Sequence, residues 1–334
     1  MEFHAKEQLP GLLDWMRQQM KACGGKTAVI GISGGKDSSV VAALAVAAYG
    51  KENVVGVLMP DGIQPDIDYS NGLVEFLGIR HYVFNIQGGT SGILDEMARL
   101  GMKPSRQTTV NLPSRMRMVT LYAIAQSENA GIVLNTSNLS EDWVGYCTVY
   151  GDATGAFSPL GMYTTEEVIA LGAELGLPEK FLIKPPSDGL TGLTDEDNLG
   201  FTYHAVNEYV RKGVVDPAVK EKIDRLHRTS RFKFQLMPVY HNGLPMALTS
   251  GAAGRFRSRW RQAQLPRRTA ISTPLWITAP RVSALQRTAA PPPASSRWRC
   301  WTLNGRNTSG RASALAPSLP TVPKIPTACS ISLR

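Results

Sequence analysis

The sequence predicts an α/β protein with a doubly wound parallel sheet, helices on both of its faces, and a disordered basic C-terminal tail. Three observations predict this. Short apolar segments alternate with helical segments over the first 137 residues, a pattern typical of parallel sheets. The apolar segments are nearly continuous, as in strands buried on both faces. The composition changes abruptly near residue 247.

The first half of the chain supplies the predicted sheet. An amphipathic helix is expected over residues 1–20. Strands are predicted at 26–33, 53–60, 81–86 and 131–137. Helices are predicted between them at 37–50, 66–78, 91–101 and 114–130. The last of these helices has apolar residues at helical spacing.

Three more helices are predicted after residue 138, at 164–176, 194–210 and 216–228. Thr164, followed by Glu three positions later, indicates a capping box at the first of them. Thr194 and Asp197 start the second helix in the same way, and Pro217 suits the first turn of the third. We expect these helices to pack beside the sheet without extending it.

Charge divides the chain into a body, 1–246, and a tail, 247–334. The net charge is +9, but 14 of the 36 basic residues and none of the 27 acidic residues lie in the tail. The body therefore carries a net charge of −5. The tail shows no sustained periodicity and is expected to be disordered. Out-of-frame translation of a GC-rich gene is one hypothesis for it. An RNA-binding arm is disfavoured because regular aromatic interleaving is lacking, so no nucleic-acid partner is expected.

Several classes of protein are excluded by the sequence. No apolar run reaches the roughly 18 residues that a membrane span needs, and the N-terminus lacks an apolar signal-peptide core. A cytoplasmic protein without a membrane partner is expected. The four cysteines form no C-x-x-C pair and the five histidines are scattered, which disfavours disulfide frameworks and Cys or His metal sites.

The strongest chemical signal is the run SGGKDS between the first predicted strand and helix. Glycines let backbone N–H groups converge on an anion, and the helix N-terminus adds further donors. A carboxylate in such a loop implies a bridging Mg²⁺. A Walker A loop is excluded, because only three residues separate Gly31 from Gly35 and an Asp follows the Lys. The residues expected to bind an anion here are Ser33, Gly34, Gly35, Lys36, Asp37 and Ser38. Their resemblance to the loop of ATP pyrophosphatases implies that the anion is ATP.

This loop resembles the pyrophosphate loop of the N-type ATP pyrophosphatases, which belong to the adenine nucleotide alpha hydrolase-like superfamily with its Rossmann-like sheet. NAD, GMP, asparagine and argininosuccinate synthetases and tRNA-modifying enzymes share it. Three further segments resemble NAD synthetase in particular: NLPSRMRMVTLYAIA (111–125), NTSNLSEDWVGYCTVYGDATGAFSPL (135–160) and KPPSDGLTGLTDEDNLGFTY (184–203). The resemblance covers most of the body.

The resemblance implies roles for individual residues. Thr136 and Ser187 would contact ATP, and Glu141 would join Asp37 on Mg²⁺. Asp37 and Asp152 would be the catalytic residues. The residues implied to bind deamido-NAD are Arg115, Arg117, Tyr122, Tyr150, Asp152 and Lys233. Arg115 and Arg117 are two positions apart, so on a helix they point in different directions.

The implied reaction is the ATP-dependent amidation of deamido-NAD to NAD through an acyl-adenylate, releasing AMP and pyrophosphate. Ammonia is the expected nitrogen donor, because only 32 residues precede the loop and no Cys has the context of an amidase nucleophile. A separate glutaminase partner stays open. Family members are homodimers, which implies a homodimer here.

Four positions depart from the family pattern. Many members carry a basic residue where Leu58, Val149 and Thr165 stand, and His where Phe232 stands. Two alternatives therefore remain at this point. One is another adenylating ATP pyrophosphatase, such as a tRNA-modifying enzyme, which the acidic body disfavours. The other is a degenerate nucleotide-binding protein that binds ATP without turnover.

Overall fold

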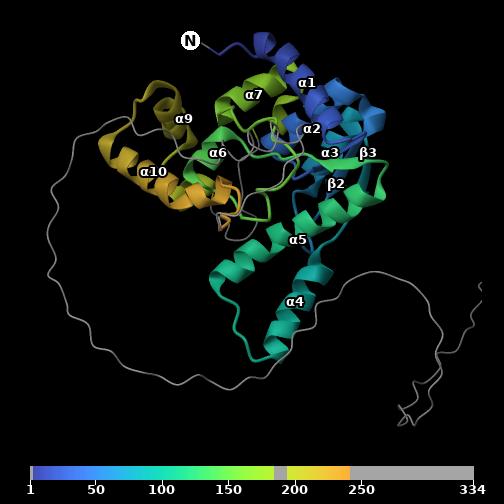
Figure 1. Cartoon of the computed structure of the whole chain (residues 1–334), viewed down its shortest axis with the longest axis vertical. Helices are drawn as coiled ribbons and strands as arrows, with labels where there is room; N and C mark the ends of the chain where they lie inside the picture. Colours follow the sequence, from blue (N-terminus) through green and yellow to red (C-terminus); the bar gives the residue numbers. More distant parts are fainter. Residues whose placement is uncertain (1–2, 184–193, 241–334) are drawn as a thin grey trace, which may run out of the picture. The chain divides into compact units, whose positions relative to one another are not determined.

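A computed structural model of the chain describes residues 3–183 and 194–240 (Figure 1). These residues all belong to the first of two compact units, Met1–Pro266. The second unit, Arg267–Arg334, lies outside the described residues. The predicted tail, 247–334, therefore lies outside them as well.

A four-stranded parallel sheet forms the centre of the first unit. Its strands are β1 (Thr27–Gly31), β2 (Val54–Leu58), β3 (Arg80–Val83) and β4 (Gly131–Val133), in the order β3-β2-β1-β4. The prediction of a parallel sheet with this strand content is confirmed. The carboxyl ends of all four strands lie at one edge, where parallel sheets of this kind bind ligands.

Helices cover both faces of the sheet, as predicted for a doubly wound fold (Figure 1). On one side lie α1 (Ala5–Ala22), α2 (Lys36–Tyr49), α3 (Ile67–Leu77) and α7 (Thr165–Glu174). On the other lies α5 (Arg106–Ser127), with α4 (Gln87–Arg99) packed against it. β1 shows the alternation clearly: Ala28 and Ile30 join the first core cluster and Val29 joins the second. Side chains alternate in this way along any strand.

The remaining helices follow β4 in sequence. They are α6 (Leu139–Val144), α8 (Asp195–Leu199), α9 (Tyr203–Lys212) and α10 (Pro217–Ser230). Short 3-10 turns occupy Lys51–Asn53, Glu179–Phe181 and Arg231–Phe234. α6, α9 and α10 enclose a small apolar cluster of their own, formed by Val144, Phe201, Val206 and Ile223. As expected, the described residues after β4 add no further strand to the sheet.

The predicted helix starts after residue 160 are confirmed by their caps. Thr164 and Glu167 form a complete capping box at α7, and Thr194 and Asp197 form another at α8. Asp216 caps α10, with Pro217 in its first turn. One boundary was wrong: the predicted helix 194–210 is two helices, because the chain adopts the left-handed conformation at Gly200, which ends a helix readily.

Other predicted elements were also wrong at their boundaries. The helices predicted at 1–20 and 91–101 lie at Ala5–Ala22 and Gln87–Arg99, and the strand predicted at 81–86 ends at Val83. The helix predicted from residue 114 begins at Arg106, with Pro113 inside it and Ser105 accepting a hydrogen bond from the Thr108 N–H at 3.1 Å. Pro113 is buried within this helix, where a proline cannot donate the backbone hydrogen bond of an ordinary helical residue. The strand predicted over 131–137 ends at Val133, after which Leu134 bridges to Phe157.

Burial on both faces was also expected for every strand, and β3 contradicts it. All four of its residues are exposed, because β3 is the outer strand of the sheet next to β2. Its pairing continues past the strand, since the Phe84 N–H donates to the Leu58 carbonyl at 2.8 Å. Edge strands are commonly more polar and exposed than central ones.

Candidate active site

The predicted phosphate loop joins the end of β1 to the start of α2, at the carboxyl edge of the sheet. The Ser33 hydroxyl lies 3.1 Å from the Ser38 hydroxyl and accepts a hydrogen bond from the Gly35 N–H at 3.2 Å. Gly34 has a φ of +77°, and a Cβ there would lie 2.9 Å from Cβ of Tyr69. Glycine is therefore required at this turn, which leads into the N-terminus of α2.

Two carboxylates face one ammonium group next to this loop. Nζ of Lys36 lies 2.9 Å from Oδ2 of Asp37 and 3.8 Å from Oε1 of Glu141. Asp37 comes from the first turn of α2 and Glu141 from the first turn of α6. The structure thus brings together two residues that are 104 positions apart and that the sequence predicted as a pair.

Asn138 connects the carboxylate of Asp37 with the backbone of Glu141. Its side-chain amide donates to Oδ1 of Asp37 at 2.9 Å, and its side-chain oxygen accepts from the Glu141 N–H at 3.1 Å. The residue is fully buried and is the N-cap of α6. One side chain therefore fixes both the start of α6 and the orientation of Asp37.

Burial and neighbouring charges shift the pKa values of two groups at this centre. Loss of water raises the pKa of Glu141 to about 8, and the charge of Asp37 adds to this effect, against the opposing charge of Lys36. Burial by itself would lower the pKa of Lys36, but the charges of Asp37 and Glu141 outweigh it and the net shift is upward. Asp195 contributes to both shifts, so this residue of α8 lies near the same centre.

A divalent metal fits the donor set at this centre. Two carboxylates already converge on a positive charge, and hard cations such as Mg²⁺ prefer oxygen ligands and keep waters and substrate phosphates as the others. In the described parts of the chain, no group of three or more His, Cys, Asp or Glu side chains is arranged to hold a metal without such help.

Asp152 lies in a loop that is tied firmly to α5. Its Oδ1 atom accepts hydrogen bonds from the Ser114 hydroxyl at 2.7 Å and from the Thr148 N–H at 2.8 Å. The Asp152 N–H returns a bond to Ser114 at 2.9 Å. Asn135, just after β4, donates to the Asp152 carbonyl at 3.0 Å. The carboxylate is thus held in one orientation at the carboxyl edge of the sheet.

The two arginines of α5 diverge, as their spacing predicts. Nε of Arg115 donates to the Val149 carbonyl at 3.3 Å, whereas Nε of Arg117 donates to the Met59 carbonyl at 3.1 Å, after β2. Burial lowers the pKa of Arg117, while the charges of Asp61 and Asp152 oppose that shift. The fork of Arg117 therefore lies between the end of β2 and the Asp152 loop.

Other predicted residues line the same edge. Thr136 is half-buried in the loop after β4. The Tyr122 hydroxyl accepts from Thr154 at 3.3 Å. Tyr150 is 63% exposed and has a φ of +58°, a conformation that costs energy for a residue other than glycine. Ser187 lies outside the described residues.

Lys233 is engaged with the protein backbone. Its Nζ donates to the carbonyls of Gly145 and Cys147, at 2.7 Å each. These carbonyls lie in the turn that ends α6 and leads toward the Asp152 loop. In this structure Lys233 therefore braces that turn, and the sequence did not indicate this contact.

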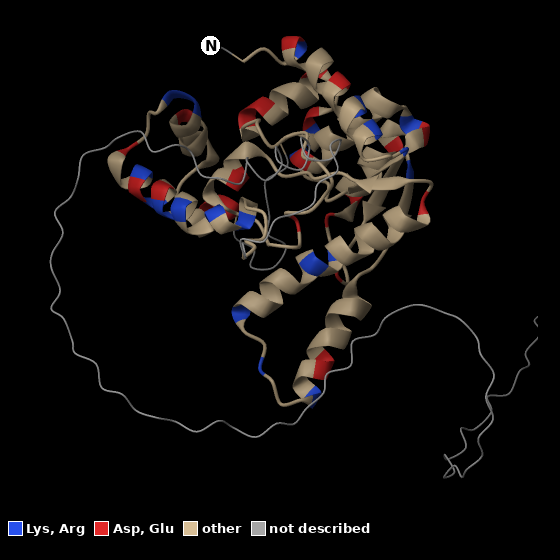
Figure 2. Cartoon of the chain, in the orientation of Figure 1, with Lys and Arg blue, Asp and Glu red and all other residues tan. Residues whose placement is uncertain are grey.

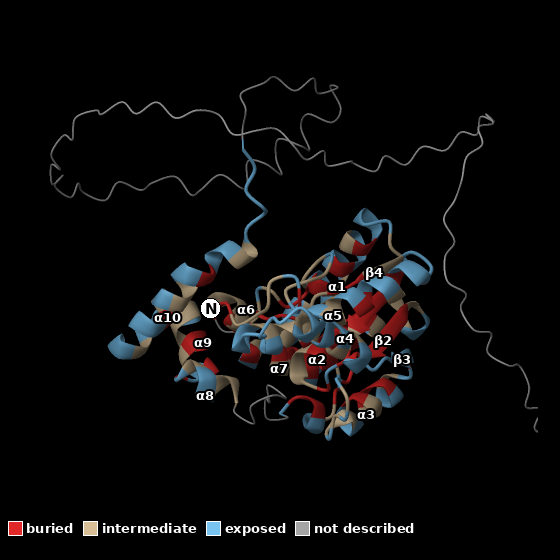
Figure 3. Ribbon diagram, turned by 90° about the horizontal axis from the view of Figure 1, so that it is seen from below, coloured by how far each residue is buried: buried red, intermediate tan, exposed pale blue. Residues whose placement is uncertain are grey.

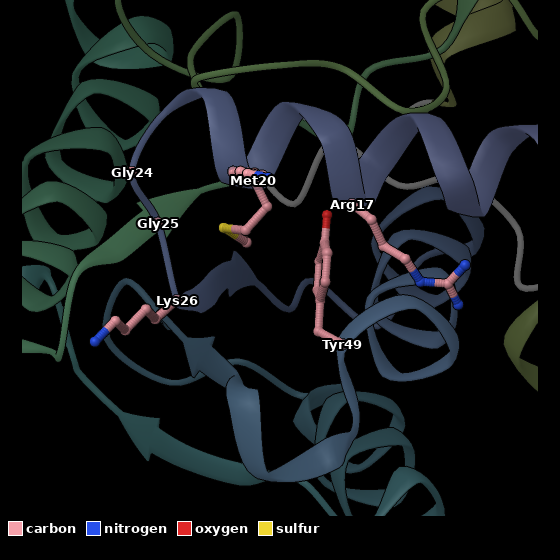
Figure 4. Close-up of a pocket in the computed structure, with 7 residues that line it drawn as sticks. Arg17, Met20, Gly24, Gly25, Lys26 and Tyr49 are labelled. Atoms are coloured by element: carbon pink, nitrogen blue, oxygen red, sulfur yellow. The ribbon is translucent and has the colours of Figure 1, made fainter.

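A surface cavity of about 410 Å³ lies elsewhere, next to Lys26 at the amino end of β1 (Figure 4). Arg17 and Lys26 point away from each other and away from the cavity (Figure 4). Arg17 is engaged with the carbonyl of Ala48 at 3.0 Å. Ligands of parallel sheets bind at the carboxyl ends of the strands, so the candidate active site is the centre around Lys36 and not this cavity.

Comparison with known proteins identifies the family. The NAD synthase family model matches residues 9–237. The NH(3)-dependent NAD(+) synthetase of Syntrophomonas wolfei is 37% identical over 234 residues, covering 68% of this chain and 93% of that protein.

The chain belongs to the NAD synthase family.

Two solved structures are similar to this NAD synthase fold. The NMN synthetase of Francisella tularensis matches with a TM-score of 0.67 and 32% identity, covering 72% of this chain and 100% of that one. The NH3-dependent NAD synthetase of Campylobacter jejuni, in complex with nitrate, matches with a TM-score of 0.59 and 28% identity over the same shares.

The departures from the NAD synthase pattern can now be located. Leu58 is 1% exposed in β2, and Thr165 is buried at the start of α7. Phe232 is exposed, and the Val149 carbonyl accepts from Arg115. Leu58 and Thr165 thus belong to the packed interior, where an unpaired basic side chain would be costly.

Asn138 is the residue that sequence analysis missed at this NAD synthase site. A signal was present, because Asn-x-x-Glu has the spacing of a helix N-cap and its third helical residue. That spacing predicts a helix from residue 139, which is where α6 begins. The segment was interpreted only as a binding motif, and this short helix was not predicted.

Proposed function

We propose that this chain catalyses the ATP- and Mg²⁺-dependent amidation of deamido-NAD to NAD, with ammonia as the nitrogen donor. The observation that carries the proposal is the convergence of Asp37 and Glu141 on Lys36, beside the predicted phosphate loop. Membership of the NAD synthase family agrees with it. AMP and pyrophosphate are the other products.

In the first step, a carboxylate oxygen of the nicotinate attacks the α-phosphorus of ATP. The bond from that phosphorus to the bridging oxygen breaks, and pyrophosphate leaves. The loop N–H groups and the N-terminus of α2 hold the β- and γ-phosphates, and the hydroxyls of Ser33 and Ser38 add donors. Lys36 supplies a positive charge to the same oxygens. Thr136 and Ser187 are proposed to contact the rest of ATP.

Asp37 and Glu141 are the residues that would hold Mg²⁺, with Asn138 keeping Asp37 in orientation. The metal, when bound, would neutralise charge on ATP and on the departing pyrophosphate. The two carboxylates would then exchange Lys36 for the metal as their counter-charge, which frees the ammonium for phosphate.

In the second step, ammonia attacks the carbonyl carbon of the acyl-adenylate. The new C–N bond forms, AMP leaves, and one proton is lost from nitrogen. Asp152 is proposed to contact the nicotinate end, held in place by Ser114 and Thr148. Arg115 and Arg117 are proposed to bind the phosphates of the dinucleotide from two sides, with Tyr122 and Tyr150 beside them. Lys233 is proposed to act at the same substrate loop.

The first test is NAD formation from deamido-NAD, ATP and ammonium, with and without Mg²⁺. We expect NAD and AMP in equal amounts, and loss of both on adding EDTA. Glutamine in place of ammonium should give no product from the purified chain; product with glutamine would contradict ammonia as the direct donor. ATP binding without turnover would indicate the degenerate alternative. Activity only on a tRNA acceptor would indicate another ATP pyrophosphatase.

A second candidate substrate is nicotinate mononucleotide. The observation that favours it is the similarity to the Francisella tularensis protein, whose name states that it makes NMN. The chemistry at the carboxylate would be unchanged, and only the absence of the adenylyl half would differ. Comparing kcat/KM for the mononucleotide and the dinucleotide decides between them. A higher value for the mononucleotide would replace the first proposal.

We also propose a cytoplasmic homodimer. β3, α4 and α5 each expose large apolar side chains, among them Val83, Ile93, Val110 and Val119, and apolar surface of this kind is typical of protein interfaces. Light scattering on the purified chain tests the dimer, and Val119→Asp is expected to shift it to monomers. None of the helices at 3–183 and 194–240 has the length and apolar character that crossing a bilayer requires.

The catalytic body is proposed to end by Met246. The family match stops at residue 237, and the strongly basic part of the sequence begins just after residue 246. A chain ending at Met246 is expected to have the same kcat as the full chain. A large loss of activity on truncation would assign a function to the tail.

A further inference from the structure

A closed ring of buried hydrogen bonds joins three helices, α6, α7 and α9. Ser140 of α6 donates from Oγ to Oδ1 of Asn207 in α9 at 2.6 Å. The Asn207 side-chain amide donates to Oγ1 of Thr165 in α7 at 2.9 Å. The Thr165 N–H donates back to Oγ of Ser140 at 3.1 Å. The three residues are between 0% and 6% exposed.

The ring fixes each of its members. Asn207 uses its oxygen on one helix and its amide nitrogen on another, so its side chain cannot turn over without breaking both bonds. Ser140 accepts one bond and donates another. Buried networks in which every group is satisfied hold their elements in one arrangement, because breaking a single bond leaves unpaired polar groups away from water.

α6 depends on such outside support. It has only six residues, fewer than an isolated helix needs to be stable in water. Ser140 lies between the cap residue Asn138 and the metal-binding candidate Glu141. A shift of Ser140 would therefore move both the carboxylate of Glu141 and the amide that orients Asp37.

We propose that Asn207 is a positioning residue for the metal centre: through Ser140 it holds α6 so that Glu141 and Asp37 converge. The inference rests on the proposed function, since the ligand that needs this convergence is Mg²⁺ bound with ATP. Asn207 contacts neither carboxylate and acts only through α6.

A second group on α9 faces the same centre. Tyr203 is one helical turn before Asn207, so both lie on the same side of α9. Tyr203 is 6% exposed, and its hydroxyl has no hydrogen-bond partner among the described residues. Its pKa is raised by burial and then by the charges of Glu141 and Asp195. The side of α9 that carries Asn207 is therefore directed at the acidic centre.

The test measures metal binding directly. Mn²⁺ replaces Mg²⁺, and its binding to the full chain with a non-hydrolysable ATP analogue is followed by electron paramagnetic resonance. Asn207→Ala is expected to weaken Mn²⁺ binding about tenfold, the size typical of residues that support metal ligands. The apparent Mg²⁺ constant in NAD formation should rise by the same factor, with a smaller change in KM for deamido-NAD.

The matched control is Thr202→Ala. Thr202 caps the same helix by accepting from the Ala205 N–H at 3.2 Å, but it is outside the ring. It should lower stability while leaving the Mn²⁺ constant within twofold of wild type. Equal weakening by Thr202→Ala would mean that any loosening of α9 has this effect and would overturn a specific role for Asn207.

Ser140→Ala provides a second route if Asn207→Ala does not fold. It removes the shared bond from the other side, so its effect should equal that of Asn207→Ala, and the double variant should be no worse than either. Additive effects, or folded variants with wild-type Mn²⁺ binding, would overturn the proposal. Wild-type protein that binds Mn²⁺ with the analogue but makes no NAD would instead refute only the proposed function.

Discussion

Asp37 and Glu141 face the same ammonium group but stand on very different parts of the molecule. Asp37 lies in the first turn of α2, in which eight consecutive residues from Ser38 to Ala45 are buried. Glu141 belongs to α6, in which only Ser140 and Val144 are buried. Figure 3 shows buried residues gathered in α2 and β2, and mostly exposed residues along α10, which packs against α6.

The difference lies in how each half of the centre is supported. The sheet half rests on two large apolar clusters, one on each face. The helical half rests on four buried apolar residues and the hydrogen-bonded ring around Asn207. The outer side of α10 carries alternating acidic and basic residues (Figure 2), so it adds little apolar burial. Elements with few buried contacts open more easily. Of the two proposed metal ligands, Asp37 belongs to the sheet half and Glu141 to the helical half.

The largest effect on kcat should come from removing the charge of Asp37, in the sheet half of the centre. Asp37→Asn keeps the shape of the side chain but removes a metal ligand, and we expect kcat to fall about 10³-fold. NAD formation at saturating substrates measures it. Asp14→Asn is the matched control, because Asp14 is exposed on α1 and pairs only with Arg17 among the described contacts. A fall of less than tenfold would argue against Asp37 as a metal ligand.

Cavities in the two halves should separate global from local stability. Leu171→Ala empties a fully buried site where α7 packs on α2, and we expect a loss of about 3 kcal/mol in the free energy of unfolding by urea. Ile223→Ala in α10 should mainly speed hydrogen exchange in α6, α9 and α10, by at least about tenfold. In Ile223→Ala, the amides of β1 and β2 should exchange at the same rate as in wild type.

Equal acceleration of exchange across the sheet in Ile223→Ala would show that the two halves open as one unit. That outcome would contradict the separate support of the sheet half and the helical half. The Mn²⁺ constant of the same variant adds a second measure, since loosening α6 should weaken metal binding before the sheet unfolds.

A smaller, pH-dependent effect is expected at the outer edge of the sheet. The hydrogen bond from Arg80 lowers the pKa of Glu128. Because the folded pKa is depressed, the ion pair stabilises the protein above the unfolded pKa, and this stability is lost as pH falls through the folded value. Arg80 is 50% exposed, so Glu128→Gln should cost only about 0.5–1 kcal/mol at pH 7.

The same variant should cost almost nothing at low pH, where Glu128 is protonated in wild type too. Urea unfolding at a series of pH values checks this, with Glu96→Gln as control, since Glu96 is fully exposed in its pair with Arg99 on α4. A cost that is independent of pH would mean that Glu128 acts by packing and not by charge.

The smallest effect on stability should come from Tyr203→Phe. Its hydroxyl is buried without a partner among the described residues, and removing such a group is expected to change the free energy of unfolding by less than about 1 kcal/mol. Urea unfolding of the variant measures this change. A stability loss above 2 kcal/mol would show that the hydroxyl has a structural partner.

The sequence predicted the parallel sheet, most helices around it and the family, because these depend on local patterns. Apolar runs indicate strands, and caps such as Thr164 with Glu167 mark helix starts. The pairing of Asp37 with Glu141 came from the resemblance, and the structure brings the two together. The predicted role of Ser187 stays a prediction, as do the individual substrate contacts.

Tertiary structure alone decided what supports the centre. Asn207, Asn138 and Lys233 make hydrogen bonds to residues from 42 to 101 positions away in sequence, and no local pattern encodes such contacts. The sequence by itself determined the loop, the strands and the capped helices, since neighbouring residues set their backbone conformation. The ring of Ser140, Thr165 and Asn207 forms only because α6, α7 and α9 pack together. That packing is set by the whole buried core.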